Sequence, residues 1–191
     1  MVRSFDGSAP GHETLSSWVD LALRAPTAGN SAGVHFVVFE GASVASYFEV
    51  ATDATWRDSA RRASGLLRAG AVVAAFSCPD LYTERYGEDD KASSGLVHEN
   101  AWTVPYWHTD AAMAVMQLLL LVENDGWSAC FWGNFRNEDA VHQLSGRDAS
   151  WRLFGSVLIG RPDEHDRQSS SLQRPVAPRA ARVTWLPRAV D

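Results

Sequence analysis

The sequence predicts an α+β domain with a mixed β-sheet flanked by helices. Short apolar runs of strand length occur at 35–39, 71–77, 128–133 and 154–160. Helix-like segments lie between them, but the two kinds of element do not alternate strictly, as they would in a doubly wound sheet. No internal repeat is visible, and 191 residues are enough for a single domain with its own core.

The composition excludes several classes of partner. A formal net charge of -6 argues against nucleic acid, because neutralising phosphates requires clustered Lys and Arg. The longest apolar run, 111–122, is shorter than the roughly twenty residues of a membrane span, so we expect a buried helix and no membrane partner. Cys78 and Cys130 have no metal-ligand spacing, and the N-terminus is polar. These features predict reduced, buried cysteines in a cytoplasmic protein.

The first helix is expected over residues 14–25, where apolar residues recur at three- and four-residue spacing. Thr14 is expected to cap this helix and Pro26 to end it. A polar connection of about eight residues then leads to the strand at 35–39, whereas two to six residues are usual. Long polar loops on a rigid scaffold often bind ligands, and a plain connection is the alternative.

The middle of the chain predicts helices on both sides of the strand at 71–77. One or two helices are expected from 42 to about 69, and the polar segment 78–95 is expected to be an irregular, mobile surface segment. Thr109 or Asp110 should then cap a long helix. That helix carries apolar residues on every face, so it must be central in the domain or shared with a second subunit.

The last third of the chain predicts fewer regular elements. A short helix is expected at 137–144, between the last two clear strands. From residue 161 the composition shifts towards Ser, Arg and Pro, and one further strand is expected at 183–185.

No catalytic motif of nucleotide-binding, hydrolase or metalloprotease type is present. One compact group of ionisable residues has the composition of a metal site, although we interpret it as a solvated turn: Asp163, Glu164, His165 and Asp166. A second group surrounds an aromatic loop and offers acid and base chemistry without a defining spacing: His98, Glu99, His108 and Asp110. If the protein is an enzyme, its reactive group is therefore expected to be a cofactor.

Three stretches together resemble the nitroreductase family of flavin enzymes. The first is ALRAPTAGNSAGVHFVVF, residues 22–39, which is similar to that family's helix, loop and strand. The second is DAAMAVMQLLLLVENDGWSACFWG, residues 110–133, which resembles its central helix and following strand. The third is IGRPD, residues 159–163, followed by a tail rich in Arg and Pro.

This resemblance implies a single domain over residues 1–191 and an intertwined homodimer, with the tail at 165–191 crossing to the partner subunit. It implies FMN bound at the dimer interface. NAD(P)H would give hydride to the flavin, which would pass electrons to a small nitroaromatic or quinone-like substrate in a ping-pong scheme. No catalytic residue and no metal ligand of the chain itself is implied.

The resemblance also implies which residues bind the cofactor. Those of the loop that would touch the flavin ring and ribityl chain are Pro26, Thr27 and Asn30. Those of the strand end that would lie against the ring are Phe131, Trp132 and Gly133. Those that would hold the phosphate and the pyrimidine edge are Arg3 and Ser4 near the N-terminus, with Arg174 and Arg179 in the tail.

Two departures from the family pattern weaken the flavin binding that the resemblance implies. The family's Arg-x-Ser does not precede Val2, and Ala32-Gly33 replaces the family's Gln-Pro. Two alternatives therefore stay open. The chain belongs to a branch that binds a deazaflavin or another bulky cofactor, with residues 78–107 shaping the pocket, or it binds flavin without turnover as a sequestering, storage or structural dimer.

Overall fold

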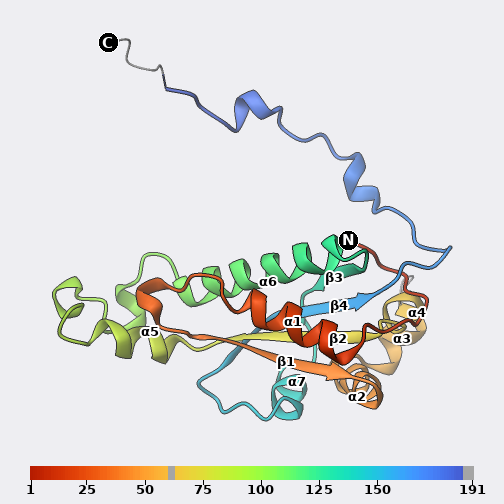
Figure 1. Cartoon of the computed structure of the whole chain (residues 1–191), viewed down its shortest axis with the longest axis horizontal. Coiled ribbons are helices and arrows are strands. Elements are labelled where there is room, and N and C mark those ends of the chain that lie inside the picture. The colour runs from red at the N-terminus through yellow and green to blue at the C-terminus, as the bar shows by residue number, and fades with distance from the viewer. Residues whose placement is uncertain (60–62, 187–191) are drawn as a thin grey trace.

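The computed structural model describes residues 1–59 and 63–186, and Figure 1 draws the whole chain. At its centre lies a four-stranded sheet in the order β1-β2-β4-β3. The strands are β1 Val34–Glu40, β2 Ala71–Ser77, β3 Ser128–Trp132 and β4 Arg152–Gly160. All three neighbouring pairs run antiparallel. The α+β class is confirmed, and these four strands are antiparallel throughout, where a mixture of directions was expected.

Helices cover both faces of the sheet (Figure 1). Helices α1, His12–Ala22, and α6, Tyr106–Asn124, pack on one face. Helices α2, Ala42–Ala51, and α7, Glu138–Leu144, pack on the other. Strand β2 is buried along its whole length because both layers cover it. Its sequence is accordingly a continuous apolar run rather than an alternating one.

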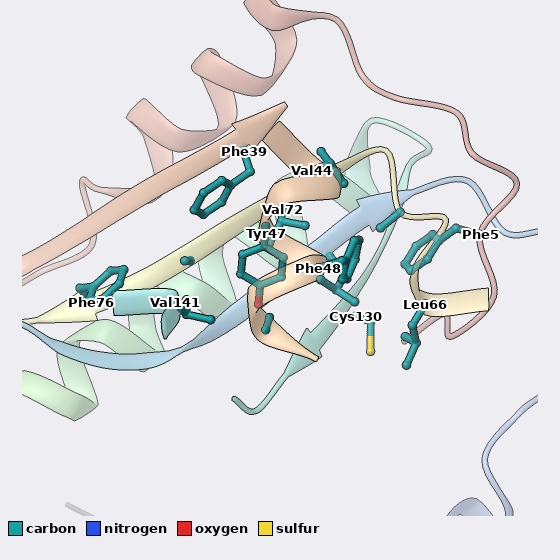
Figure 2. Packing of buried hydrophobic residues seen from close by; sticks show 14 residues of the cluster. Phe5, Phe39, Val44, Tyr47, Phe48, Leu66, Val72, Phe76, Cys130 and Val141 are labelled. Atoms are coloured by element: carbon teal, nitrogen blue, oxygen red, sulfur yellow. The ribbon is translucent and has the colours of Figure 1, made fainter. Parts of the chain in front are cut away.

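Aromatic rings fill the core beneath α2 (Figure 2). The Tyr47 ring lies 5.1 Å from the Phe39 ring and 5.4 Å from the Phe48 ring, centre to centre. No part of Tyr47 is exposed to solvent. Burying a large apolar side chain stabilises a fold by about 1.5–3 kcal/mol, so this cluster holds α2 firmly on the sheet.

Two helices begin earlier than the sequence predicts. Helix α1 has Gly11 at its N-cap position, so Thr14 lies inside the helix and the prediction of a Thr14 cap is wrong. Helix α6 starts directly after Pro105, so the predicted start at Thr109 or Asp110 is also wrong. The ring of Pro105 fixes φ at -73°, close to the helical value, which lets the helix begin at the next residue.

The segment 78–95, expected to be irregular, contains a regular helix. Helix α5, Pro79–Tyr86, has proline at its first position, where the missing N–H has no intrahelical partner to lose. Short 3₁₀ turns follow at Ala92–Ser94 and Glu99–Ala101. The prediction of irregular structure is therefore wrong for the first half of this segment.

The helical stretch expected from 42 to about 69 is divided into short pieces. After α2 come α3, Ala54–Ser59, and α4, Ala63–Leu66. Residues 60–62 of the expected helix lie outside the described residues.

The C-terminal tail leaves the body of the molecule after β4 (Figure 1). It contains 3₁₀ turns at Ser170–Gln173 and Arg179–Ala181, but the strand expected at 183–185 is not formed. No other strand of the described chain lies beside that stretch to pair with it. Among the described residues, no helix combines the length and the apolar character that crossing a membrane requires.

Candidate functional site

Two of the segments that carry predicted cofactor residues, the N-terminal segment and the loop before β1, lie at opposite ends of the sheet (Figure 1). Phe5 forms an isolated β-bridge with Pro162, just beyond the end of β4, so Arg3 and Ser4 lie at that end. The N–H of Cys78 bonds the carbonyl of Gly33 at 2.9 Å, which places the loop before β1 at the other end. The nine residues of β4 span roughly 27 Å between these ends.

A polar cavity of about 300 Å³ opens beside the N-terminal segment, and we call it the Arg3 pocket. The residues that line it are Arg3, Ser4, Ser64, Gly65, His165, Asp166, Arg167, Gln168 and Ser170. It joins three parts of the chain: the N-terminus, helix α4 and the start of the tail. The Arg3 and Ser4 positions expected from the sequence are therefore brought together, with Arg167 as an additional cation.

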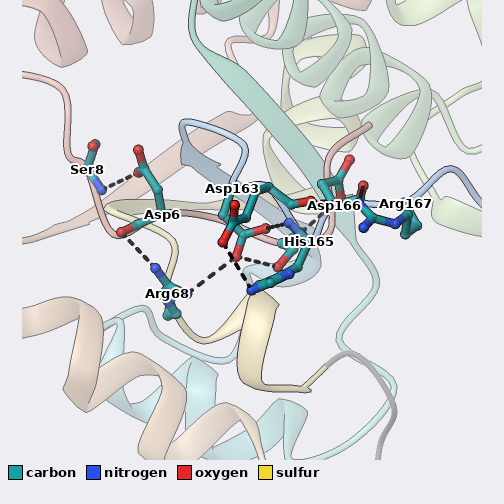
Figure 3. A network of polar contacts seen from close by, with 9 residues as sticks. Asp6, Ser8, Arg68, Asp163, His165, Asp166 and Arg167 are labelled. Carbon is teal, nitrogen blue, oxygen red and sulfur yellow. Dashed lines mark hydrogen bonds and ion pairs between the residues drawn. The ribbon is translucent and has the colours of Figure 1, made fainter.

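Acidic side chains from the start of the tail fix the N-terminal segment (Figure 3). The Asp166 carboxylate accepts the backbone N–H groups of Arg3 at 2.8 Å and Ser4 at 3.1 Å. The Ser4 hydroxyl donates to Asp163 at 2.9 Å, and Asp163 also pairs with Arg68 at 3.3 Å. Both carboxylates thus hold the chain in place, and within the described residues no three His, Cys, Asp or Glu side chains form a metal-binding group.

Gly65 allows the N-terminal segment to approach α4 closely. A Cβ atom at this position would lie 2.6 Å from Ser4 Oγ and 2.9 Å from the backbone oxygen of Arg3. The carbonyl of Gly65 accepts the N–H of Phe5 at 3.2 Å. A glycine is therefore required where the wall of the Arg3 pocket meets the N-terminal segment.

The donors of the Arg3 pocket fit an anionic or carbonyl-rich group. The Arg3 guanidinium makes no hydrogen bond to any described residue. Arg167 Nη1 donates to the backbone carbonyls of Glu164, at 2.6 Å, and Asp166, at 2.9 Å. A guanidinium binds phosphate or a planar pair of acceptors through two parallel hydrogen bonds. The set is consistent with the phosphate or the pyrimidine edge of a flavin nucleotide.

At the other end of the sheet, a buried carboxylate holds the loop at 26–33. Asp110 of α6 is only 1% exposed, and its Oδ2 accepts the N–H of Ala28 at 2.7 Å. The same oxygen accepts the hydroxyl of Tyr82, from α5, at 2.9 Å. Burial and the neighbouring Asp110 raise the pKa of Tyr82, so its hydroxyl stays protonated and remains a donor. Helices α5 and α6 thus meet at this loop.

A second contact fixes the loop from α5. Arg85 Nε donates to the carbonyl of Gly29 at 2.9 Å, and its two Nη atoms donate to Asp90 at 2.7 and 2.8 Å. Asn30 and Ala32 have φ angles of 56° and 53°, a left-handed conformation that costs a non-glycine residue roughly 1–2 kcal/mol. The contacts from α5 and α6 compensate for this strain. The chain's own contacts therefore define the conformation of this loop.

The side chains of the loop differ in whether their hydrogen-bonding groups are available to a ligand. Thr27 Oγ1 accepts the N–H of Ala32 at 3.1 Å, so it supports the loop itself. The amide of Asn30 is exposed and makes no hydrogen bond to any described residue. Beside the loop lies a mainly apolar cavity of about 250 Å³ that Thr27 lines together with Leu23, Val34 and Asp110. Asn30 is thus the side chain most available to a ligand.

The two aromatic side chains of the strand end at 131–133 pack on opposite faces of the sheet. The Trp132 ring packs 5.7 Å from Trp56 and 6.2 Å from Phe48, in the core under α2. Phe131 points to the opposite side of the sheet and lies 5.5 Å from Phe154. A Cβ at Gly133 would meet the ring of Phe135 at 2.5 Å.

The tail arginines are not part of either cluster in a single chain. Arg174 and Arg179 are exposed on the extended tail, and Arg179 lies over the ring of Trp185 at 5.7 Å. Arg167 lines the Arg3 pocket instead. Phosphate binding by Arg174 and Arg179 stays a prediction about the assembled protein.

The acid and base residues around the aromatic loop do not form a catalytic group. Glu99 pairs with Arg152 at 2.7 Å, and His108 Nδ1 bonds the buried Ser77 hydroxyl at 3.1 Å. Burial, reinforced by Arg152, lowers the pKa of His108 and keeps it neutral near pH 7. Asp110 is committed to the loop, so these side chains have structural partners.

The sequence analysis missed most of the residues that support the two clusters. Tyr82, Arg85 and Arg167 carry no motif, and their partners lie in other elements. Asp110 did carry a signal, since a carboxylate directly before a long apolar run requires a specific partner when it is buried.

Comparisons with known proteins show what this chain is similar to. The profile of the Nitroreductase family matches residues 1–161. A Bacillus subtilis (strain 168) protein named "Putative NAD(P)H nitroreductase YodC" is 28% identical over 208 aligned positions, which cover 97% of this chain and 94% of that protein.

Solved structures show the same fold. The crystal structure of the Nitroreductase Family Protein from Streptococcus pneumoniae TIGR4 superposes with a TM-score of 0.67 at 18% identity, covering 97% of this chain and 94% of that one. A "putative nitroreductase in complex with FMN" from Exiguobacterium sibiricum 255-15 gives a TM-score of 0.68 at 16% identity, over 97% and 92% of the two chains.

Proposed function

This chain belongs to the nitroreductase family, and on that basis we propose that it is an FMN-dependent oxidoreductase. It takes hydride from NAD(P)H and delivers it to a small nitroaromatic or quinone-like substrate. The observation that carries the proposal is the Arg3 pocket, about 300 Å³ in volume, where the guanidinium of Arg3 makes no hydrogen bond to the part of the chain that the structure describes. The FMN complex of the Exiguobacterium relative supports the choice of cofactor.

FMN, when bound, supplies the two-electron hydride chemistry, and the chain supplies its position. Arg3 and Arg167 hold the anionic phosphate or the electron-poor pyrimidine edge with charge-assisted hydrogen bonds. Asn30 offers both an amide donor and a carbonyl acceptor to the ring or the ribityl chain. The strand end at 131–133 forms a wall against which a planar ring can lie. With FMN bound there, the nicotinamide and the oxidised substrate would have to enter the site one after the other, as a ping-pong scheme requires.

A complete site needs two copies of this chain. The Arg3 pocket and the loop at 26–33 lie at opposite ends of one sheet, so both can touch one flavin only if the loop comes from a partner subunit. Helix α6 exposes an apolar stripe of Met113, Met116 and Leu120, which are 41%, 52% and 59% exposed. A homodimer would bury this stripe, and the tail at 165–191 would gain a partner surface to cross.

The proposal is tested by purifying the protein and releasing its cofactor. We expect a yellow protein that yields one FMN per chain and is bleached by NADH or NADPH without oxygen. The Asn30→Ala variant should bind FMN roughly tenfold more weakly, the effect of losing about 1.4 kcal/mol of hydrogen bonding. The matched control is Gln143→Ala, an exposed amide on α7.

A colourless protein with no measurable affinity for FMN would overturn the proposal. A yellow protein that neither NADH nor NADPH bleaches would support flavin binding but contradict the oxidoreductase activity. The alternative of a protein that binds flavin without turnover would then hold.

A further inference from the structure

Three side chains from separate elements close a ring of hydrogen bonds next to the strand end at 131–133. The Tyr47 hydroxyl donates to Ser156 Oγ at 2.8 Å. Ser156 Oγ donates to Asn134 Oδ1 at 2.9 Å, and Asn134 Nδ2 donates back to the Tyr47 hydroxyl oxygen at 2.9 Å. Each member therefore donates one hydrogen bond and accepts one within the ring.

Two of the three residues that form the ring are fully buried. Tyr47 and Ser156 are fully buried, whereas Asn134 is half-buried at the edge of the sheet. Burial raises the pKa of Tyr47, against the opposing effect of its hydrogen bonds to Asn134 and Ser156, so the hydroxyl keeps its proton. In a low-dielectric core, closed chains of hydrogen bonds reinforce one another, and removing one member leaves the others unsatisfied.

The position of the ring matters because the sheet ladder stops there. Strand β3 pairs with β4 as far as Trp132, which lies opposite Ser156. Two residues later, Asn134 is tied to the same Ser156 by its side chain instead of its backbone. The peptide between Trp132 and Asn134 is thus held at both ends.

Gly133 gives this short peptide its shape. No described residue accepts a hydrogen bond from the N–H groups of Gly133 or Asn134. The carbonyl of Gly133 accepts the N–H of Phe135 at 3.1 Å, which turns the chain away from the sheet. The peptide at 132–134, which we call the ledge, thus has a fixed shape and two N–H donors that no described residue uses.

We propose that Tyr47 and Ser156 are positioning residues that act through Asn134 to hold this ledge in register with the bound flavin ring. The proposal rests on the function proposed above, and it adds residues that never touch the cofactor. A ring whose only role was stability would not need to reach a half-exposed residue beyond the end of the ladder. Correct placement within fractions of an ångström is what hydride transfer to or from a ring demands.

The test compares Tyr47→Phe, Asn134→Ala and the double variant in the FMN-loaded protein. Tyr47→Phe removes one hydroxyl and keeps the packing, and Asn134→Ala changes a half-exposed side chain, so we expect both variants to fold. Three quantities are measured: the dissociation constant of FMN from the apoprotein, the visible absorption bands of bound FMN, and the rate of anaerobic flavin reduction by NAD(P)H.

We expect each variant to shift the flavin bands and to slow reduction by roughly 10- to 100-fold. FMN should still bind at one per chain, because the Arg3 pocket is unchanged. The double variant should lose little more than either single one, since the first substitution already opens the ring. The control is Trp18→Phe, which removes a hydrogen bond to Asp125 of 2.7 Å on the other face of the sheet. It should lower thermal stability without moving the bands or the rate.

Wild-type bands and reduction rates in both Tyr47→Phe and Asn134→Ala would overturn the inference while leaving the proposed function standing. Additive losses in the double variant would also overturn it, because they would mean that the residues act separately. A wild-type protein that takes up no FMN would overturn the proposed function and this inference together.

Discussion

The carboxylate of Asp110 accepts the backbone N–H of Ala28 at 2.7 Å across 82 positions of sequence. This contact joins the longest helix to the loop that offers Asn30 to a ligand. Because contacts within the protein hold the loop, little of its conformational freedom remains to be lost on binding a ligand. The buried carboxylate is thus a support for the binding surface and is not free to act as an acid or base.

Replacing Asp110 should therefore weaken cofactor binding without touching the cofactor. Asp110→Asn keeps the shape but replaces the charged acceptor with a neutral amide oxygen, which weakens the hydrogen bonds from Ala28 and Tyr82 by about 1–3 kcal/mol in total. We expect the dissociation constant of FMN to rise at least fivefold and the N–H of Ala28 to exchange with deuterium faster. Fluorescence titration and hydrogen exchange measure the two effects. The matched control is Asp20→Asn, an exposed acid on α1, and equal effects in both variants would contradict the role of Asp110.

Gly65→Ala should disrupt the Arg3 pocket. The new Cβ would lie 2.9 Å from both the Arg3 carbonyl oxygen and the Ser4 Cα, which are backbone atoms that cannot rotate away. The N-terminal segment must therefore move, at a cost of about 1–3 kcal/mol for overpacking. Thermal unfolding and FMN titration should both register the loss.

Gly11→Ala is the corresponding control, because a Cβ there meets nothing within 4 Å. It should change thermal stability by less than about 1 kcal/mol, as an N-cap substitution, and leave FMN affinity unaltered. Retained FMN affinity in Gly65→Ala would show that the Arg3 pocket is not the cofactor site.

The sequence predicted correctly those elements that form because of their own local residues. Residues 71–77 form a strand exactly where a continuous apolar run lies between Gly70 and Pro79. Helix α5 was missed because its polar sequence has no apolar periodicity. It is stabilised by distant contacts instead, through Tyr82 to Asp110 and Arg85 to the loop.

The candidate site divides in the same way. The family resemblance identified Arg3, Ser4 and Asn30 as candidate site residues, because they match positions in the family's sequence pattern. The supporting contacts join residues far apart, such as Tyr47 and Ser156 at 109 positions. No spacing rule applies at such distances, since the sheet order and the helix packing decide which residues meet.

Acid should destabilise the fold through two half-buried histidines. Burial lowers the pKa of both His35 and His108, with Arg147 and Arg152 adding to the effect. The unfolded chain therefore takes up protons at a higher pH than the folded chain, and the free energy of unfolding falls as pH drops below about 6.5. Thermal midpoints measured from pH 7.5 to 5 should decrease.

The His108→Asn variant should show a shallower decrease over this pH range, because it removes one of the two groups. The exposed His98 supplies the control: His98→Asn should follow the wild-type curve. If His108→Asn kept the full wild-type slope, His108 would have no part in the acid sensitivity.

Leu120→Asp should separate the subunits and empty the flavin site at the same time. Leu120 is 59% exposed in a single chain and continues the apolar stripe of Met113 and Met116 on α6. In the proposed dimer this stripe is buried, and an unpaired carboxylate there costs several kcal/mol. Light scattering after gel filtration should give a dimer for the wild type and a monomer for Leu120→Asp. FMN affinity should fall at least tenfold, because each Arg3 pocket loses the partner's loop.

Leu144→Asp, 40% exposed on α7, is the matched control and should stay dimeric with full FMN content. A Leu120→Asp monomer that retains FMN would show that one chain completes the site, contrary to the opposite placement of its two halves.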